Sequence, residues 1–305
     1  MSNTNATLSA SIIALQCLQF IRQHFPILTS VATDFSADAA KYNQAVVSRV
    51  VTPIAAADYS TSTGYAATAT SVADVSVTIN KHKHVSVSFN DQEISSTPRN
   101  LISEQTEAAA YSLGKQMSDD LWALVTTTNF TATPVNITNE AAAARSTLLT
   151  LRQKLVAAGA TLNRQGIVSA GTFAALAGDS NIFAKLYTDA DIDYEEGVIQ
   201  NYAGYQRIVE FNGIPAGSTP FVRGLFGGKE GLVIATRVPA DPGMMASGVP
   251  IPAEIGVVQD ADTGMALQYR YMYDAFKGNL QMTLTVMYGV SVGVNAHAII
   301  LTSTS

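Results

Sequence analysis

The chain has 305 residues, of which 47% are hydrophobic and 14% are charged, and its formal net charge at pH 7 is −6. A typical globular domain has about 25% charged residues, so the surface is either rich in Ala, Ser and Thr or buried against other subunits. The acidic balance, with no run of Lys or Arg, argues against sequence-specific binding of nucleic acid. The single cysteine, Cys17, excludes an internal disulfide, and no Cys/His spacing indicates a zinc site.

The first predicted element is an amphipathic helix over residues 8–25, followed by a polar connector, TDFSADAAKYNQ. The helix either packs on its own domain or docks on a neighbouring subunit. No basic region precedes its apolar stretch, so we expect no signal peptide, no membrane span and a cytoplasmic chain. Its apolar residues recur at helical spacing, namely Ile12, Leu15, Leu18 and Ile21.

Two strands joined by a long loop come next. Residues 45–54 read as the first strand, and residues 56–71 form a loop with almost no charge and no large aliphatic side chain. From Val75 to Asp91 apolar and polar residues alternate, except where lysines stand on the apolar side. This pattern predicts one unbroken strand with one dry face; its last fifteen residues alone would span roughly 50 Å. We therefore expect a hairpin too long to be covered by its own chain.

Four basic side chains lie in the middle of this strand. Lys81 and Lys83 interrupt its dry face, so at least one is expected within about 4 Å of a carboxylate, on another subunit in preference to the nearby Asp91 and Glu93 of its own chain. Simple solvation of both lysines is the alternative. His82 and His84 share the wet face, but the flanking lysines would repel a cation and no carboxylate adjoins. We expect solvated or intersubunit histidines and no metal there.

Helices and further strands fill the rest of the chain. A long helix is predicted over residues 99–126, and a second helix over 139–160 that ends at a Gly159 cap. Because the helices and the antiparallel strands are segregated, the predicted fold class is α+β. The long helix carries a stripe expected to face the core: Leu113, Met117, Leu121 and Leu124. The further strands are predicted within 165–179 (with a short helix), 197–215, 231–239, 254–259, 265–273 and 280–301.

No stretch of the sequence carries recognisable catalytic chemistry. Asp189, Asp191 and Asp193 begin like a calcium-binding loop, but Tyr194 stands where Gly is needed and Gln200 where Glu is needed. The stretch FGGKEG lacks the spacing of a phosphate-binding loop. We expect no enzyme, no cofactor and no metal. A hydrolase or binding module that uses the acidic loop 188–196 is a remote alternative.

The order of these elements resembles the tailed-bacteriophage major capsid proteins, which share the Hong Kong 97 fold. The resemblance covers nearly the whole chain and rests on order and spacing. It is carried by SVTINKHKHVSVSFNDQEIS, a long helix that ends in LGKQMSDDLWALV, IVSAGTFAALAG, GVIQNYAGYQRIVEFNGIP, and the tail from DADTGMALQYRYMY to the end. It implies an N-terminal arm over 1–42, an extended loop (E-loop) over 43–92, a peripheral domain with a spine helix over 93–138 and about 240–285, and an axial domain over 139–239 and about 286–305.

The resemblance also implies a function. The chain would assemble as hexamers and pentamers into an icosahedral or prolate shell around a phage genome, in the host cytoplasm and then in the virion. Scaffolding, portal or decoration proteins are further partners that it allows, and double-stranded DNA would be contacted only non-specifically. An encapsulin-like protein compartment is the alternative with the same fold. The residues expected to contact other subunits are Lys81, Lys83, His82, His84, Val75, Val77, Ile79, Tyr59, Tyr65, Ile12 and Leu15.

Overall fold

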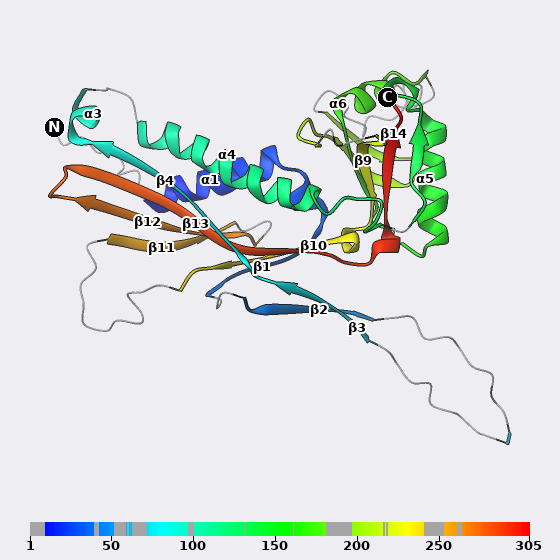
Figure 1. Ribbon diagram of the computed structural model, residues 1–305, viewed down its shortest axis with the longest axis horizontal. Coiled ribbons are helices and arrows are strands. Elements are labelled where there is room, and N and C mark those ends of the chain that lie inside the picture. Colours follow the sequence, from blue (N-terminus) through cyan, green and yellow to red (C-terminus); the bar gives the residue numbers. More distant parts are fainter. Residues whose placement is uncertain are drawn as a thin grey trace.

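The computed structural model describes residues 10–39, 43–51, 59, 61–62, 72–96, 101–130, 132–160, 162–180, 197–215, 217, 219–240, 253–260 and 264–305. Within these ranges, the side chains of 10–12, 32–39, 47–51, 72–75, 94, 96, 101–104 and 253 are left undescribed. This part of the chain forms two six-stranded sheets and a separate two-stranded hairpin, with helices packed on both sheets (Figure 1). The arrangement confirms the expected α+β class.

The first sheet is built around one long strand, β13 (Asn279–Val292). One edge of β13 pairs first with β12 (Ala266–Asp274) and then with β10 (Leu232–Val238), and its other edge pairs with β4 (Lys81–Asn90). The outer strands are β11 (Ala253–Gln259) and β1 (Ala32–Ala39). All pairs are antiparallel except β1 with β10. The polar connector expected after the first helix is thus partly a strand, held by backbone pairing rather than by an apolar pattern.

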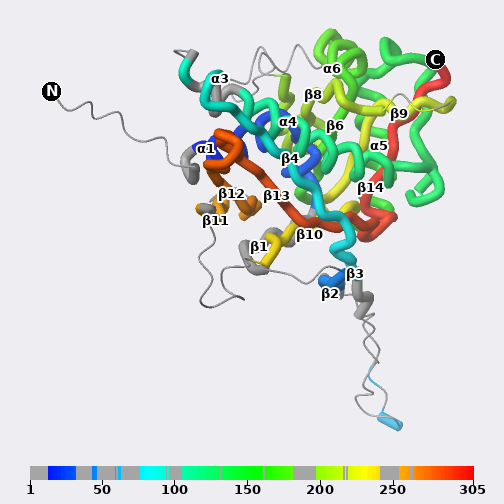
Figure 2. The backbone as a smooth tube through the Cα atoms, turned by 60° about the vertical axis from the view of Figure 1, so that its left-hand side comes forward, coloured from blue at the N-terminus to red at the C-terminus, as the bar shows by residue number. Residues whose placement is uncertain are grey.

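Two helices cover one face of the first sheet: α1 (Ala10–His24) and α4 (Leu101–Trp122) lie side by side above it (Figures 1 and 2). A short helix, α2 (Ile27–Ser30), follows α1, and α3 (Asp91–Ser96) follows β4. Alternate residues of β13 point at this helical layer and are buried: Met282, Leu284, Val286 and Tyr288. No helix in the described ranges is long and apolar enough to cross a membrane.

The second sheet has the order β5-β14-β9-β6-β8-β7. Helix α5 (Arg145–Ala157) packs on it through Leu148, Leu151 and Leu155, which are all buried. A shorter helix, α6 (Ala170–Ala177), belongs to the same unit. The strands are β5 (Val135–Ile137), β6 (Gln165–Val168), β7 (Val198–Tyr202), β8 (Tyr205–Glu210), β9 (Phe221–Gly227) and β14 (Ala298–Ser303).

Helix α5 begins later than the sequence predicts. A 3₁₀ turn, η1 (Glu140–Ala142), comes first, and the backbone is extended at Ala143 and Ala144, so the continuous helix starts only at Arg145. Its end agrees with the expectation. Gly159 has a φ of +75°, and its N–H donates to the Val156 carbonyl at 3.0 Å, which is the backbone geometry of a glycine cap.

Two connections cross between the sheets at the same place. β9 leads into β10 through η2 (Lys229–Gly231), and β13 leads into β14 through η3 (Asn295–His297). The crossings are bonded to each other: Val294 N–H donates to the Glu230 carbonyl at 2.8 Å, and His297 Nδ1 lies 2.9 Å from Glu230 Oε2. Gly293 leaves no room for a side chain because the Glu230 carbonyl lies against it.

This crossing corrects one expectation. Residues 280–301 do not form one strand, since the chain leaves the first sheet after Val292 and enters the second at Ala298. Strand β10 and all of β13 belong to the first sheet. The apolar run of residues 280–301 continues across the crossing, so its pattern does not show where the first sheet ends.

Candidate assembly surface

A two-stranded hairpin extends from the body of the molecule. Its strands β2 (Ala45–Val51) and β3 (Val72–Thr78) pair antiparallel with each other along their whole length, from Ala45 opposite Thr78 to Val51 opposite Val72. Neither belongs to one of the two larger sheets. Figures 1 and 2 show the hairpin leading away from both sheet units.

The predicted unbroken strand 75–91 is wrong at one point. Ile79 and Asn80 interrupt it, so β3 pairs with β2 in the hairpin, whereas β4 pairs with β13 in the first sheet. Backbone hydrogen bonds hold the break: Asn43 N–H donates to the Ile79 carbonyl at 2.9 Å, and Ile79 N–H donates to the Gln44 carbonyl at 3.0 Å. The strand thus passes from the hairpin into the sheet within two residues.

The base of the hairpin packs on the face of the first sheet that lies opposite the helices. Val77 is 1% exposed and contacts Val233 and Ala235 of β10, and Ile79 is fully buried against Met287 of β13. The backbone at Thr78 crosses β13 where Gly289 offers no side chain. Val77 and Ile79, both expected at contacts between subunits, are therefore buried within one chain.

Lys81 finds its carboxylate within its own chain, contrary to the expectation of a partner on another subunit. Its Nζ lies 2.7 Å from Oδ1 of Asp120 on α4, and the Tyr288 hydroxyl donates to Asp120 Oδ2 at 2.5 Å. Burial of the Asp120 carboxylate opposes its ionisation, but the bonds from Lys81 and Tyr288 outweigh burial and lower its pKa. Burial raises the pKa of Tyr288, and the Asp120 carboxylate raises it further. Lys81, Asp120 and Tyr288 thus connect the start of β4 to α4 and to β13.

The other basic residues of β4 form no ion pair with Asp120. Lys83 and His84 are exposed. His82 Nε2 lies 2.8 Å from the Thr285 hydroxyl, which itself donates to the Lys83 carbonyl at 3.2 Å, so Nε2 carries the proton. Burial, followed by His84 and Arg270, lowers the pKa of His82. His82 is therefore hydrogen-bonded to a residue of its own sheet.

The N-terminal helix packs on its own domain. Its buried residues are Ile13, Ala14, Cys17, Leu18 and Ile21, so the core-facing stripe is rotated from the predicted one. Leu15 is 36% exposed, and the side chain of Ile12 lies outside the described part. Burial raises the pKa of the Cys17 thiol to about 12, with Glu107 adding to the effect, so this cysteine is an unreactive core residue.

The remaining predicted contact residues lie around the hairpin. Tyr59 is 60% exposed, and Tyr65 falls outside the described residues. Val75 lies in β3 opposite Ser48, and its side chain is also undescribed. On the spine helix, Leu113, Met117 and Leu121 are buried, whereas Leu124 lies beyond the last turn and is only partly buried.

Several exposed apolar side chains escaped the sequence reasoning. The largest fractions exposed are those of Phe276, at 98% in the turn between β12 and β13, and Leu162, at 82% beyond the end of α5. Leu149 and Val156 on α5 are 41% and 53% exposed. A signal was present in the sequence for α5, because these residues and two arginines recur at helical spacing on a helix without any Asp or Glu.

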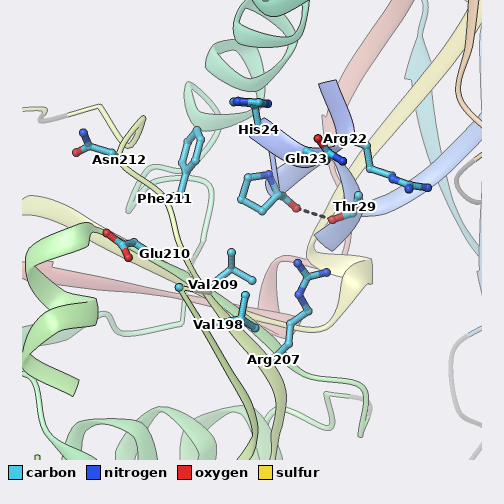
Figure 3. Close-up of a pocket in the computed structure, with 12 residues that line it drawn as sticks. Arg22, Gln23, His24, Thr29, Val198, Arg207, Val209, Glu210, Phe211 and Asn212 are labelled. Carbon is cyan, nitrogen blue, oxygen red and sulfur yellow. Dashed lines mark hydrogen bonds between the residues drawn. The ribbon is translucent and has the colours of Figure 1, made fainter. Parts of the chain in front are cut away.

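A cavity of about 540 Å³ lies where α1 and α2 approach β7 and β8 (Figure 3). Arg207 points into it from β8, and the Thr29 hydroxyl on its other side donates to the Pro26 carbonyl at 2.9 Å. Arg22 is paired with Asp260 at 3.4 Å. The lining contains no Ser, Cys or Lys, and the described ranges hold no cluster of His, Cys, Asp or Glu suited to a metal. The acidic loop 188–196 lies outside the described residues.

Comparison with known proteins identifies this fold. No protein-family model matches the sequence, and no curated protein is significantly similar to it. Among the solved structures that share the fold, the capsid of Cyanophage P-SCSP1u has a TM-score of 0.59 at 14% identity, covering 90% of this chain and 86% of that chain. Gordonia phage Cozz gives 0.56 at 12% identity over 92% and 87%. The mature capsid of bacteriophage PhiM1 gives 0.53 at 12% identity over 91% and 87%.

These likenesses cover about nine-tenths of the chain. They confirm the fold that the sequence resemblance implied. The chain has the α+β, Hong Kong 97-type fold of phage capsid structures.

Proposed function

We propose that this chain is the structural major capsid protein of a tailed bacteriophage, and that it self-assembles into the icosahedral or prolate shell that encloses the genome. The observation that carries this proposal is the shared fold with the Cyanophage P-SCSP1u capsid over 90% of the chain. Two features of the chain support it. The hairpin β2–β3 has little cover of its own, and the charged fraction of 14% is low for a protein surrounded only by water.

The proposed role assigns a task to each part. The first sheet with α4 would form the peripheral domain, the second sheet with α5 and α6 the axial domain, and the hairpin the E-loop that lies across a neighbouring subunit. Copies would associate as hexamers and pentamers, assembled in the host cytoplasm and found in the virion. Scaffolding, portal or decoration proteins would act at this shell. With a net charge of −6, contact with packaged DNA would be non-specific.

Electron microscopy of the purified chain tests this proposal. We expect closed shells by negative stain, and a sedimentation profile dominated by large particles whose subunits bury more than about 2,000 Å² against their neighbours. Monomers alone at micromolar concentration, under conditions that keep the chain folded, would refute the proposal.

The contents of native particles separate the two shell-forming functions. Particles recovered from the natural source should hold nuclease-protected double-stranded DNA. A protein cargo without DNA would instead show an encapsulin-like compartment. No feature of the described residues favours that second function, so the capsid proposal stands alone.

A further inference from the structure

Helix α5 has two apolar stripes, of which its own chain buries one. The inner stripe, Leu148, Leu151 and Leu155, is 0–1% exposed in the core of the second sheet. On the outer side, Leu149 and Val156 are 41% and 53% exposed. Figure 1 shows α5 at the margin of the second sheet unit, with no other labelled element on its outer side. An aliphatic pair left open on a helix that is already packed indicates a second partner.

The outer stripe also carries positive charge. Arg145, Leu149, Arg152 and Val156 stand at positions i, i+4, i+7 and i+11, so they share one face of the helix. Both arginines are exposed, and α5 contains no Asp or Glu. Arg152 lies against Gly204 and forms no ion pair with any described carboxylate. We call Arg145, Leu149, Arg152 and Val156 the α5 stripe.

Lys154 does not belong to the α5 stripe. Its ammonium group donates to the Thr133 carbonyl at 2.8 Å and to the Pro134 carbonyl at 3.4 Å, so the chain already satisfies it. The guanidinium groups of Arg145 and Arg152 have no comparable partner among the carboxylates of the described part, and Asp179 Oδ2 accepts instead from the Arg145 backbone N–H at 2.8 Å. A guanidinium group beside exposed aliphatic carbons suits a partner that offers carboxylates together with apolar side chains.

One segment of this chain has that composition. Residues 189–196 read DADIDYEE, which places five carboxylates within eight residues and intersperses them with Ala190, Ile192 and Tyr194. We propose that the α5 stripe binds the acidic segment 189–196 of a second copy of this chain. The inference rests on the proposed function, because it assigns a contact within the assembled shell. Charge complementarity would set the register, and the aliphatic pair would exclude water from the contact.

A contact of this kind has a consequence for symmetry. The stripe and the acidic segment are different surfaces, so the interface is heterologous: each copy offers its stripe to one neighbour and its segment to another. Repeated by rotation, such a contact closes into a ring rather than a two-fold dimer. It therefore fits subunits that surround a common axis.

Charge reversal tests the electrostatic half of the proposal. The double variant Arg145→Glu and Arg152→Glu should fold with an unchanged circular dichroism spectrum and melting temperature, because both side chains are exposed. Its threshold concentration for assembly should rise at least about tenfold. Asp191→Lys and Glu195→Lys in the same chain should restore assembly. The control Lys229→Glu and Lys277→Glu changes charge equally at exposed positions outside α5 and should leave the threshold unchanged. An unchanged threshold for the first variant would overturn the proposal.

Disulfide trapping identifies which copy supplies the segment. Val156→Cys and Ile192→Cys in one chain should give an oxidised ladder of covalent oligomers that ends at a closed ring, and the native Cys17 will not interfere because it is fully buried. Mixing the two single variants should give covalent dimers only. A bond confined to single chains, or no bond in particles that do form, would overturn the inference while leaving the proposed function intact. Failure of the unaltered chain to assemble would instead refute the proposed function.

Discussion

The ribbon that runs from β3 into β4 is used in two ways on either side of Asn80. In both halves an apolar odd-numbered side chain faces a buried surface. In β3, Val77 packs against Val233 on the sheet face opposite the helices, and in β4, Val85 packs against the core that includes α4. The β4 half is part of the sheet, whereas the β3 half pairs only with β2. The β4 half therefore contributes to folding, and under the proposed function the β3 half belongs to the hairpin that lies across a neighbouring molecule.

The largest effect on the free energy of unfolding is expected in α4, the helix that supports the β4 half. Leu121 of α4 is fully buried, so Leu121→Asp would place an unpaired carboxylate in the core and cost several kcal/mol of the free energy of unfolding. The variant should be insoluble. Ser112→Asp, at an exposed position of the same helix, should remain soluble and folded. Soluble, folded Leu121→Asp monomer would show that this stripe is not core.

A smaller effect is expected at Ile79, where the chain passes from β3 into β4. Ile79 is fully buried, but its apolar neighbours are few, chiefly Met287 and Val46. Ile79→Ala should lower the free energy of unfolding by about 2 kcal/mol, near the low end for such truncations, as measured by urea denaturation. Amide exchange should speed up in β2 and β3 more than in β4. The exposed Ser76→Ala change is the control, and equal exchange in both halves would contradict the asymmetry.

The Lys81–Asp120 ion pair at the start of β4 should contribute less to the free energy of unfolding than Ile79 does. Lys81 and Asp120 are partly exposed, with side chains 31% and 16% accessible, so Lys81→Met should cost about 1 kcal/mol at neutral pH. The pKa of Asp120 is lowered in the folded chain, so its contribution is present above the ordinary Asp pKa of about 3.9. It is lost as the pH falls through the lower, folded value.

The pH dependence makes this prediction specific. The difference in unfolding free energy between wild type and Lys81→Met should stay constant above about pH 5 and shrink below about pH 4. Lys83→Met is the matched control, because Lys83 is exposed on the same strand, and its difference from wild type should be near zero at every pH. A Lys81→Met difference that persists unchanged at pH 2–3 would show that packing of the lysine stem, not the charge, is what matters.

The two halves of the ribbon also show what the sequence can reveal. Alternation correctly indicates the buried side of Val77 in β3 and of Phe89 in β4, but it cannot reveal a step that leaves this side unchanged. The partner of Lys81 was equally hidden, since Asp120 lies on another element and no local spacing relates the two. The helix α1 stripe was ambiguous because the Ile12–Leu15 and Ile13–Cys17 faces both lead into Leu18 and Ile21.

The sequence correctly predicts features that depend on residues close together in the chain. The Gly159 cap depends on one residue that tolerates a positive φ, and the α4 stripe depends on spacing within a single helix. Strand β1 could not be found in this way, because its pairing with β10 uses backbone groups that every residue has. The α5 stripe is visible in the sequence as a pattern, but only the structure shows that the stripe beside it is the buried one.

The smallest effect on folding is expected at the far end of the hairpin. Val51 pairs with Val72, so residues 52–71 can be replaced by Asn-Gly, whose two-residue turn fits strands in that register. The replaced stretch contains one aliphatic residue larger than Ala, Ile54, and two tyrosines, so little burial is lost and the unfolding free energy should change by less than about 0.5 kcal/mol. Closed shells should nevertheless fail to form, because the ribbon would no longer reach its neighbour. If the shortened chain builds normal shells, the base of the hairpin is sufficient, and the division of the ribbon at Asn80 into folding and assembly halves is wrong.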